Sequence, residues 1–499
     1  MLKLNLNTYR DKVLGCWMGK NIGGTLGGPF EGRREMNDAT FYVQKMDGKP
    51  LPNDDLDLQL LWLRAAEEKG LLRLNERVLA EYWSYENIGP WNEYGVSKCN
   101  IARGFMPPMS GSCNNDVWKW SNGAWIRSEI WACFFPGMPD VACKYAYYDS
   151  CIDHCGEGIY AEMFTASMES AAFLLDDVRS VIEFGVARIP EDSRVARAVR
   201  LACDCYDKHV PFAEAREKIV QDSADLGWFQ APGNLAFTTL GLLYGEGDFG
   251  KAVCLAANCG DDTDCTAGTA GAVMGIMLGI SGIPEKWTKP IGDSIQTCCV
   301  LPNPNSHLGG DIPHTVTELT ERTIRQARLY SMSTIAESVQ FTDGPTEIPE
   351  GYVEQQKSSD FVRKEIVSLP QYRMGYDLPF GVIFVRFDQC PDVESGQPIK
   401  IYFSMSYSFF IETMVSIKLE LPEGWKASPA DECCMVNKAC LRDPATGSRK
   451  AECAFTVIPG EFSGAMFYLK ATVTLRGRSL PYTISIPLQK KGSAVLEYK

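Results

Sequence analysis

Histidine is scarce in this chain of 499 residues, which contains only four. The sequence also has no H-E-x-x-H zinc motif, no G-x-S-x-G nucleophile elbow and no phosphate-binding P-loop. The sequence therefore lacks the usual signatures of zinc proteases, α/β-hydrolases and P-loop nucleotide hydrolases. Any chemistry here has to rest on other side chains, and carboxylates are the best supplied.

Positive charge is also in short supply. Lys and Arg together number 49 against 63 Asp and Glu, which gives a formal net charge of −14. A surface that binds nucleic acid concentrates Lys and Arg, and we therefore expect no nucleic-acid partner. A small anionic substrate is not excluded, because backbone N–H groups can bind one.

A signal peptide and a clear membrane span are missing as well. The first residues, MLKLNLNTYRDKVLG, have no apolar core with a small-residue cleavage site. Residues 265–283 carry no charge, but small residues dominate them and three Asp residues precede them, so we expect a buried helix here. We predict a cytoplasmic protein that does not bind membranes and whose 19 cysteines stay reduced.

The pattern of apolar residues divides the chain into two parts. Up to about residue 340 they recur at helical spacing, as in 56–70 and 156–176. After a polar stretch punctuated by prolines, residues 399–407 and 467–476 alternate between apolar and polar, as strands do. We therefore predict a multidomain protein with an all-α domain over 1–342, a linker over 343–370 and a small all-β, immunoglobulin-like sandwich over 371–499 as an accessory domain.

Two groups of acidic residues stand at predicted helix starts. The first group is Asn53, Asp54, Asp55 and Asp57, and the second is Asp261, Asp262 and Asp264. Helix capping needs only one acid at each start. Several buried carboxylates repel one another unless a cation lies between them, and their hard oxygens suit Mg²⁺, Mn²⁺ or Ca²⁺. If the two helix starts converge, they form a site for two metal ions that position and activate a water.

Four stretches, taken together, resemble the ADP-ribosylglycohydrolase family. They are DKVLGCWMGKNIGGTLGGPFEG (11–32), NDDLDLQL (53–60), SNGAWIR (121–127) and CGDDTDCTAG (259–268). The resemblance in order and spacing extends from residue 10 to about residue 340. It implies an all-α fold with a central cleft that holds two Mg²⁺ or Mn²⁺ ions. It also implies hydrolysis of the bond between the anomeric carbon of ADP-ribose and its acceptor.

The resemblance further implies roles for individual residues. The implied metal ligands, for one or two ions per chain, are Asn53, Asp54, Asp55, Asp262, Asp264 and Cys265. The implied catalytic residues are Glu31, Asp54 and Asp55. The implied substrate-binding residues are Ser121, Asn122, Gly123, Ala124, His154, Gly156 and Glu157. Considered without the resemblance, His154 is as readily a structural hydrogen-bonding residue, and the glycines at 23, 24, 27 and 28 most simply allow tight turns and close packing.

Three departures from the family pattern bear on the substrate. Asn53 replaces a hydroxyl residue, Cys265 replaces Thr, and Ala124 stands where many members have Ser. We expect a metal-dependent glycoside hydrolase that releases an N- or O-linked ribofuranosyl group, and the resemblance implies ADP-ribose on a protein or small molecule. Two alternatives stay open. One is a furanosidase for a carbohydrate or nucleoside-like compound, and the other is a catalytically silent binding or structural protein.

Overall fold

The computed structural model describes residues 1–300, 312–333, 339–407, 413–437 and 452–493. Contacts between residues divide the chain into two compact units. The first comprises Met1–Tyr94 and Val117–Leu369, and the second comprises Gly95–Asp116 and Pro370–Lys499. The predicted order of a helical part followed by a β-rich part is confirmed.

The division differs in two places from the residue ranges expected from the sequence. Residues 95–116 belong to the second unit, because Phe105 and Met109 are part of its buried core. The segment expected as a linker contains helix α17 (Tyr352–Lys357) and a π-helical turn (Val362–Val367), and it belongs to the first unit as far as Leu369. The polar composition of this segment suggested a linker, although a few of its apolar residues, such as Val362, are buried.

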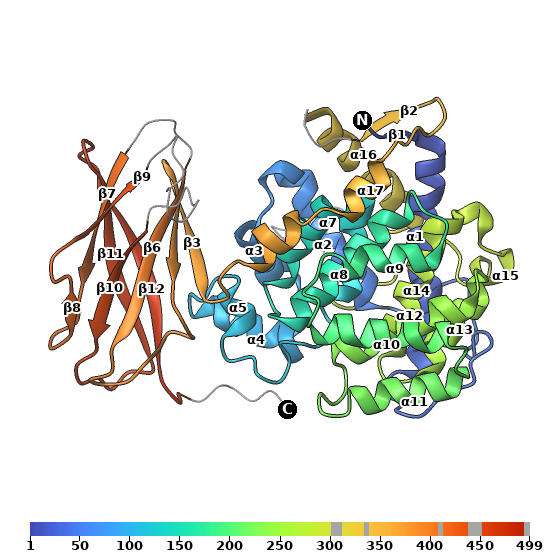
Figure 1. Ribbon diagram of the computed structural model, residues 1–499, viewed down its shortest axis with the longest axis horizontal. Coiled ribbons are helices and arrows are strands. Elements are labelled where there is room, and N and C mark those ends of the chain that lie inside the picture. The colour runs from blue at the N-terminus through green and yellow to red at the C-terminus, as the bar shows by residue number, and fades with distance from the viewer. Residues whose placement is uncertain (301–311, 334–338, 408–412, 438–451, 494–499) are drawn as a thin grey trace. The chain divides into compact units, whose positions relative to one another are not determined.

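The first unit consists mainly of helices, and a long irregular segment over 31–53 joins the end of α1 and its 3₁₀ turn to α2 (Figure 1). Its α-helices are α1 (Leu6–Gly27), α2 (Asp54–Lys69), α3 (Glu76–Glu86), α6 (Glu129–Phe134), α7 (Pro139–Ser150), α8 (Glu157–Ala172), α9 (Val178–Val186), α10 (Arg194–Asp207), α11 (Phe212–Asp222), α12 (Ala231–Gly245), α13 (Phe249–Asn258), α14 (Thr263–Leu278), α15 (Glu285–Thr288) and α16 (Val316–Ser333). Helix α4 (Asn92–Ala102) begins in this unit and ends in the second. A short parallel pair, β1 (Lys3–Asn5) with β2 (Gln340–Thr342), is the small departure from an all-α unit.

Helices α1 and α14 approach so closely that glycines of α1 touch the backbone of α14. A Cβ atom on any of four α1 glycines would collide with the backbone of α14, in the pairs Gly15–Gly275, Gly19–Gly271, Gly23–Ala267 and Gly27–Thr263. The residue numbers run in opposite directions, so the two helices are antiparallel. The expected close approach of a neighbouring helix along Ala267, Gly271 and Gly275 is confirmed. Gly279, expected on the same stripe, instead ends α14 with a φ of 69°.

This packing also determines which helix ends meet. Because Gly27 lies against Thr263, the C-terminal end of α1 adjoins the N-terminal end of α14. Gly24, one turn earlier, leaves room for the side chain of Asn53 at the start of α2. Both acidic helix starts therefore lie at one end of α1.

The second unit contains two five-stranded sheets. Its strands are β3 (Arg373–Leu378), β4 (Gly381–Arg386), β5 (Asp392–Val393), β6 (Ile399–Tyr407), β7 (Thr413–Glu420), β8 (Lys426–Ser428), β9 (Cys433–Asn437), β10 (Glu452–Ile458), β11 (Met466–Leu475) and β12 (Tyr482–Lys490), and it also includes α5 (Met109–Ser112). The strand orders are β3-β4-β6-β10-β8 and β5-β12-β11-β7-β9. Neighbouring strands are antiparallel except β5, which pairs parallel to β12.

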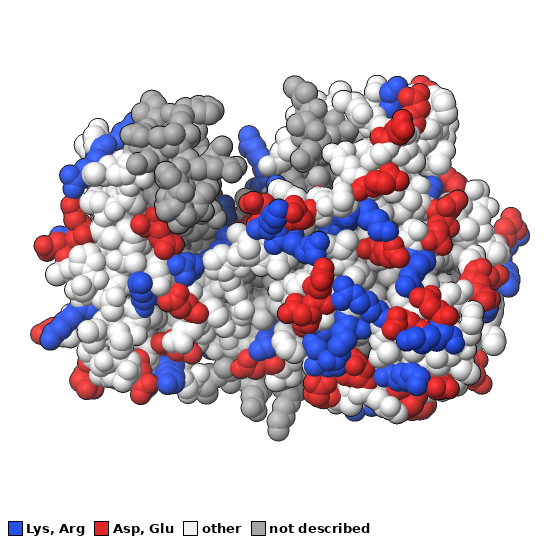
Figure 2. All heavy atoms as spheres, in the orientation of Figure 1, with Lys and Arg blue, Asp and Glu red and all other residues white. Residues whose placement is uncertain are grey.

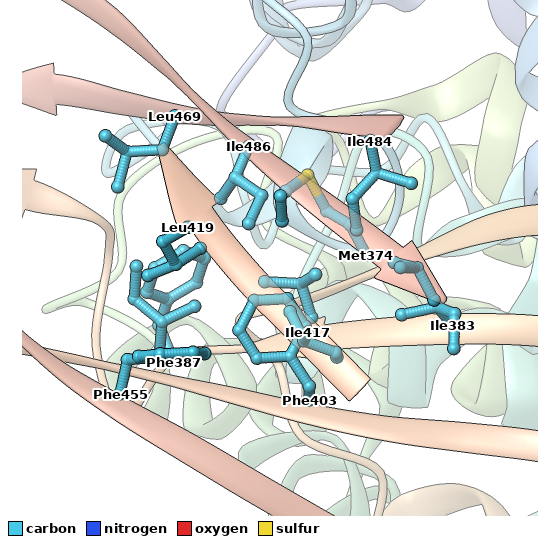
Figure 3. Close-up of a cluster of buried hydrophobic side chains, with 14 of the residues drawn as sticks. Met374, Ile383, Phe387, Phe403, Ile417, Leu419, Phe455, Leu469, Ile484 and Ile486 are labelled. Atoms are coloured by element: carbon cyan, nitrogen blue, oxygen red, sulfur yellow. The ribbon is translucent and has the colours of Figure 1, made fainter. Parts of the chain in front are cut away.

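Alternating side chains of both sheets fill the core of this unit. Ile401 and Phe403 of β6 are fully buried, as are Leu469 and Val473 of β11. Figure 3 shows side chains of both sheets gathered in this core, among them Phe403, Phe455, Ile417, Leu469 and Ile486. The period-two pattern of the sequence predicted this burial for 399–405 and 469–475.

Among the described residues, we find no helix whose length and apolar character would let it cross a membrane. The uncharged stretch that begins at Cys265 forms most of α14, which is buried almost throughout. Acidic and basic side chains are interspersed on the face of the molecule in Figure 2.

Replacing Gly19 by Ala should destabilise the first unit, because the added Cβ would collide with the backbone carbonyl of Gly271. Overpacking a core costs roughly 1–3 kcal/mol, and a backbone obstacle cannot rotate away as a side chain can. Thermal denaturation should show a lower transition temperature for Gly19→Ala. Gly344→Ala is the matched control, since its Cβ would meet only the Thr342 hydroxyl at 3.5 Å. Equal transition temperatures for the two variants would contradict the backbone contact.

Candidate metal centre and substrate cleft

The two acidic helix starts come together in the first unit. Asp55, Asp264 and Cys265 form one group that could hold a metal ion, and Glu31, Asp262 and Asp264 form another. Within each group the ligand atoms lie within 4.8 Å of one another. Asp264 belongs to both groups, so two ions bound there would share one carboxylate. The structure thus brings together five of the residues that the sequence singled out.

The two helix starts are built differently. At α2 the side-chain oxygen of Asn53 accepts a hydrogen bond from the backbone N of Asp55 at 2.7 Å, which is a normal N-cap. Asp262 holds the N-cap position of α14, but its side chain makes no capping bond. Its Oδ2 accepts a hydrogen bond from Asn122 Nδ2 at 2.7 Å instead. Capping therefore explains Asn53 and leaves Asp262 free for another role.

Asp55 has a cation on its buried side. Lys20 Nζ lies 3.3 Å from Asp55 Oδ2 and 2.8 Å from Glu129 Oε1, and all three side chains are buried. Burial raises the pKa of Asp55 well above its ordinary value, while the charge of Lys20 opposes that rise. One Lys shared by two carboxylates leaves this group short of positive charge.

Asp262 and Asp264 are more strongly perturbed. Burial, together with the nearby Asp55 and Glu31, raises the pKa of Asp262 to about 8. Burial and Asp262 raise the pKa of Asp264 well above its usual range. The buried Asp264 Oδ1 has no hydrogen-bond partner. A cation beside it would offset the repulsion between the two carboxylates, and a set of carboxylate oxygens fits Mg²⁺ or Mn²⁺.

Cys265 is the soft member of the first group. Its Sγ donates a hydrogen bond to Asp55 Oδ1 at 3.4 Å. Burial, followed by the charges of Asp262 and Asp55, raises the pKa of the thiol well above its ordinary value. A neutral thiol is a poor ligand for a hard cation, so the oxygens of Asp55 and Asp264 are the stronger donors here.

Glu31 and Asp54 also line the cleft. Glu31 follows a 3₁₀ turn at Gly28–Phe30, and its segment is tied to the start of α14 by a hydrogen bond from Asp261 N to Arg33 O at 2.7 Å. Although the side chain of Glu31 is exposed, partial loss of water in the cleft and the nearby Asp54 raise its pKa. Burial also raises the pKa of Asp54, although a hydrogen bond from Tyr94 opposes the rise.

Two other acids of the clusters hold loops in place. Asp57 Oδ2 accepts hydrogen bonds from the backbone N atoms of Cys298 and Cys299 at 2.5 and 2.7 Å. Asp261 accepts one from Phe229 N at 3.2 Å and one from Asn234 Nδ2 at 3.1 Å. Neither belongs to the two ligand groups that share Asp264.

A cavity of about 200 Å³ adjoins the acidic groups. Among the described residues, its lining includes Glu31, Asp54, Asp262, Asp264 and Cys265. Ser121, Asn122 and Gly123, three of the residues expected to bind substrate, line it as well. The cavity therefore joins the candidate metal centre to a polar loop.

The other four residues expected to bind substrate do not line this cavity. Ala124 and His154 are fully buried, and His154 lies between Ser121 Oγ (3.1 Å from Nε2) and Asp153 Oδ1 (2.8 Å from Nδ1). Glu157 Oε2 accepts a hydrogen bond from Val195 N at 3.0 Å, and Gly156 precedes α8 with a φ of 54°. His154 therefore supports the loop through Ser121, whereas Glu157 holds the start of α10 (Arg194–Asp207).

Sequence reasoning missed one side of the cavity. Trp91, Asn92, Glu93 and Tyr94 line it, and so does Phe229. The stretch WNEY matches no motif, and its mixture of aromatic and polar residues was the only signal. Its position in the cleft results from the folding of the 87–94 segment over the start of α2, where Tyr94 reaches Asp54 at 3.1 Å.

Comparison with known proteins agrees with this geometry. A curated protein, the ADP-ribosylarginine hydrolase Tri1 of Pseudomonas putida (strain GB-1), is 39% identical to this chain over 49 residues. That stretch covers only 10% of this chain and 13% of the relative, so it carries little by itself. The sequence profile of the family described as ADP-ribosylglycohydrolase matches residues 5–324, which include both ligand groups and the helices that hold them. The chain therefore belongs to the ADP-ribosylglycohydrolase family.

Proposed function

We propose that the protein is a metal-dependent glycohydrolase that cleaves the N- or O-glycosidic bond of a ribofuranosyl group. The observation that carries this proposal is the pair of ligand groups that share Asp264 beside a cavity. Membership in the ADP-ribosylglycohydrolase family supports hydrolysis of a glycosidic bond. Retention of Asp54, Asp55, Asp262 and Asp264 argues against a catalytically silent protein.

The carboxylates would divide between two Mg²⁺ or Mn²⁺ ions. Asp55 and Asp264 would hold one ion, and Glu31, Asp262 and Asp264 would hold the other. Asn53, Asp54 and Cys265 complete the proposed ligand set as weaker or indirect contributors. When bound, such ions supply positive charge that orients substrate hydroxyls and lowers the pKa of a water.

The residues of the chain would handle the proton. A carboxylate that binds a cation is deprotonated, so Glu31, which lies at the cavity, would act as a general base and take a proton from the attacking water. Asp54 and Asp55 would stabilise the positive charge that develops at the anomeric carbon in an oxocarbenium-like transition state.

Two classes of substrate fit this proposal. ADP-ribosyl adducts are the reference class, since the family and the name of the relative point to them. A furanoside without phosphate is the second class, because no Lys or Arg occurs among the described residues of the lining. A cytoplasmic location completes the proposal, because the reducing cytoplasm would keep the many cysteines of the chain as thiols.

Removal of divalent metal should abolish hydrolysis and lower the thermal transition temperature, because binding to the folded state alone stabilises it. Dialysis against a chelator, followed by metal analysis, gives the starting sample. Addition of Mg²⁺ or Mn²⁺ should restore both activity and stability. Full turnover by a sample verified to be free of metal would contradict the proposal.

Asp264→Asn should lower kcat by at least about 100-fold, because this carboxylate belongs to both ligand groups and electrostatic residues at active sites commonly contribute that much. Metal content per chain, measured by elemental analysis, should fall with it. Asp38→Asn is the matched control, since Asp38 is exposed. Unchanged metal content and turnover in Asp264→Asn would show that the ligands are wrongly assigned.

The metal-free protein should lose stability as pH rises. Asp262 has a pKa of about 8 in the folded protein, whereas an unfolded Asp titrates near about 4. Its contribution to the free energy of unfolding is therefore fully present below about pH 4 and is lost as pH rises toward about 8. Thermal denaturation of chelated protein between these values should show this decline, and Asp262→Asn should make it shallower. A variant whose decline matches that of the parent protein would disprove the assignment.

A further inference from the structure

The cavity contains a carboxylate that the candidate metal centre does not use. Glu93, at the start of α4, is 4% exposed, and its Oε2 has no hydrogen-bond partner. It lines the same cavity as Glu31, Asp262 and Asp264. Because a buried oxygen without a donor is costly, Glu93 Oε2 needs a donor from a bound molecule.

Glu93 is held against the backbone of the loop at 121–123. A Cβ on Gly123 would collide with Glu93 Oε1 and with the ring of Tyr94, so only glycine lets the carboxylate lie there. A side-chain hydrogen bond joins Glu93 to Ser121, whose Oγ lies 3.1 Å from His154 Nε2. The carboxylate is thus fixed in place by buried groups.

Apart from the proposed metal ions, the described lining of the cavity offers no cationic side chain to offset the charge of Glu93. Five carboxylates line it, namely Glu31, Asp54, Glu93, Asp262 and Asp264, and its described lining contains no Lys or Arg. The buried cations nearby are already paired. Lys20 lies 3.3 and 2.8 Å from Asp55 and Glu129, and Arg127 lies 2.8 Å from both Asp149 and Asp153.

This arrangement favours hydroxyl groups over phosphate. A sugar hydroxyl can donate to a carboxylate in a strong, charge-assisted hydrogen bond, whereas phosphate oxygens are acceptors and repel it. Proteins usually bind phosphate with Arg, Lys or helix N-termini. The diphosphate of ADP-ribose is attached to the ribose itself, so it would enter the cavity or lie at its mouth when the ribose is bound at the metal centre.

We propose that Glu93 selects an uncharged furanoside, whose hydroxyls donate to Glu93 Oε2, and disfavours a diphosphate at this position. The half-exposed Trp91 and the ring of Phe229, which line the same cavity, supply apolar surface for the face of a sugar ring. This inference rests on the proposed glycohydrolase activity and narrows its substrate from ADP-ribosyl adducts to furanosides without phosphate.

Calorimetric binding to Mg²⁺-saturated protein tests the selection without requiring turnover. The probes are methyl β-D-ribofuranoside and ADP-ribose, and the variants are Glu93→Gln and, as an exposed control on α3, Glu81→Gln. Glu93→Gln should tighten binding of ADP-ribose by about 10-fold, which is 1.4 kcal/mol, and weaken binding of the furanoside. Glu81→Gln should change neither affinity. An unchanged ratio of the two affinities in Glu93→Gln would overturn the proposal.

The unsubstituted protein gives a second test that does not depend on the folding of a variant. If the cavity selects against the diphosphate, methyl β-D-ribofuranoside should bind the Mg²⁺-saturated protein more tightly than ADP-ribose does. Tighter binding of ADP-ribose would overturn the inference. The proposed glycohydrolase activity has a separate test. It would be contradicted if metal-loaded protein hydrolysed neither the furanoside nor an ADP-ribosylated arginine peptide.

Discussion

Direct contact between the backbones of α1 and α14 is the constraint on which the site depends. Four glycines of α1 face small residues of α14 with no side chain between the helices. The contact leaves Gly27 beside Thr263, so the chain leaving α1 toward Glu31 passes the start of α14, where Asp262 and Asp264 stand. A side chain at any of these glycines would separate the helices and, with them, the two halves of the candidate metal centre.

The charge balance of the first unit follows from that geometry. Helix ends that meet in the interior bring their carboxylates together, and buried carboxylates require protons or cations. Lys20 forms an ion pair with Asp55, and backbone N–H groups donate hydrogen bonds to Asp57. Asp262 and Asp264 accept hydrogen bonds from the side chains of Asn122 and Asn53, but no Lys or Arg of the described chain pairs with them, and a metal ion fits on their cavity side. The acids that hold loops are thereby distinguished from those that are available for chemistry.

The acids of the cavity come from different segments of the first unit. Asp55, Asp262 and Asp264 stand at the starts of α2 and α14, whereas Trp91 and Glu93 come from the segment leading into α4. A single carboxylate held on a glycine of the opposite loop changes the charge of the cleft without disturbing the helices beneath it. Loops positioned by a rigid scaffold are the usual carriers of such differences.

The sequence by itself determined the helical and β-rich parts, the buried nature of α14 and the grouping of its acids, because periodicity, small residues and repeated carboxylates are local properties of the chain. It could also nominate Glu31, Asp55, Asp262 and Asp264 through the family resemblance. Only the tertiary structure decided that His154 stands behind Ser121, that residues 95–116 belong with the sandwich, and that Glu93 lines the cleft. These features depend on which distant segments meet, and that is decided by the packing of whole helices and not by the residues adjacent in the chain.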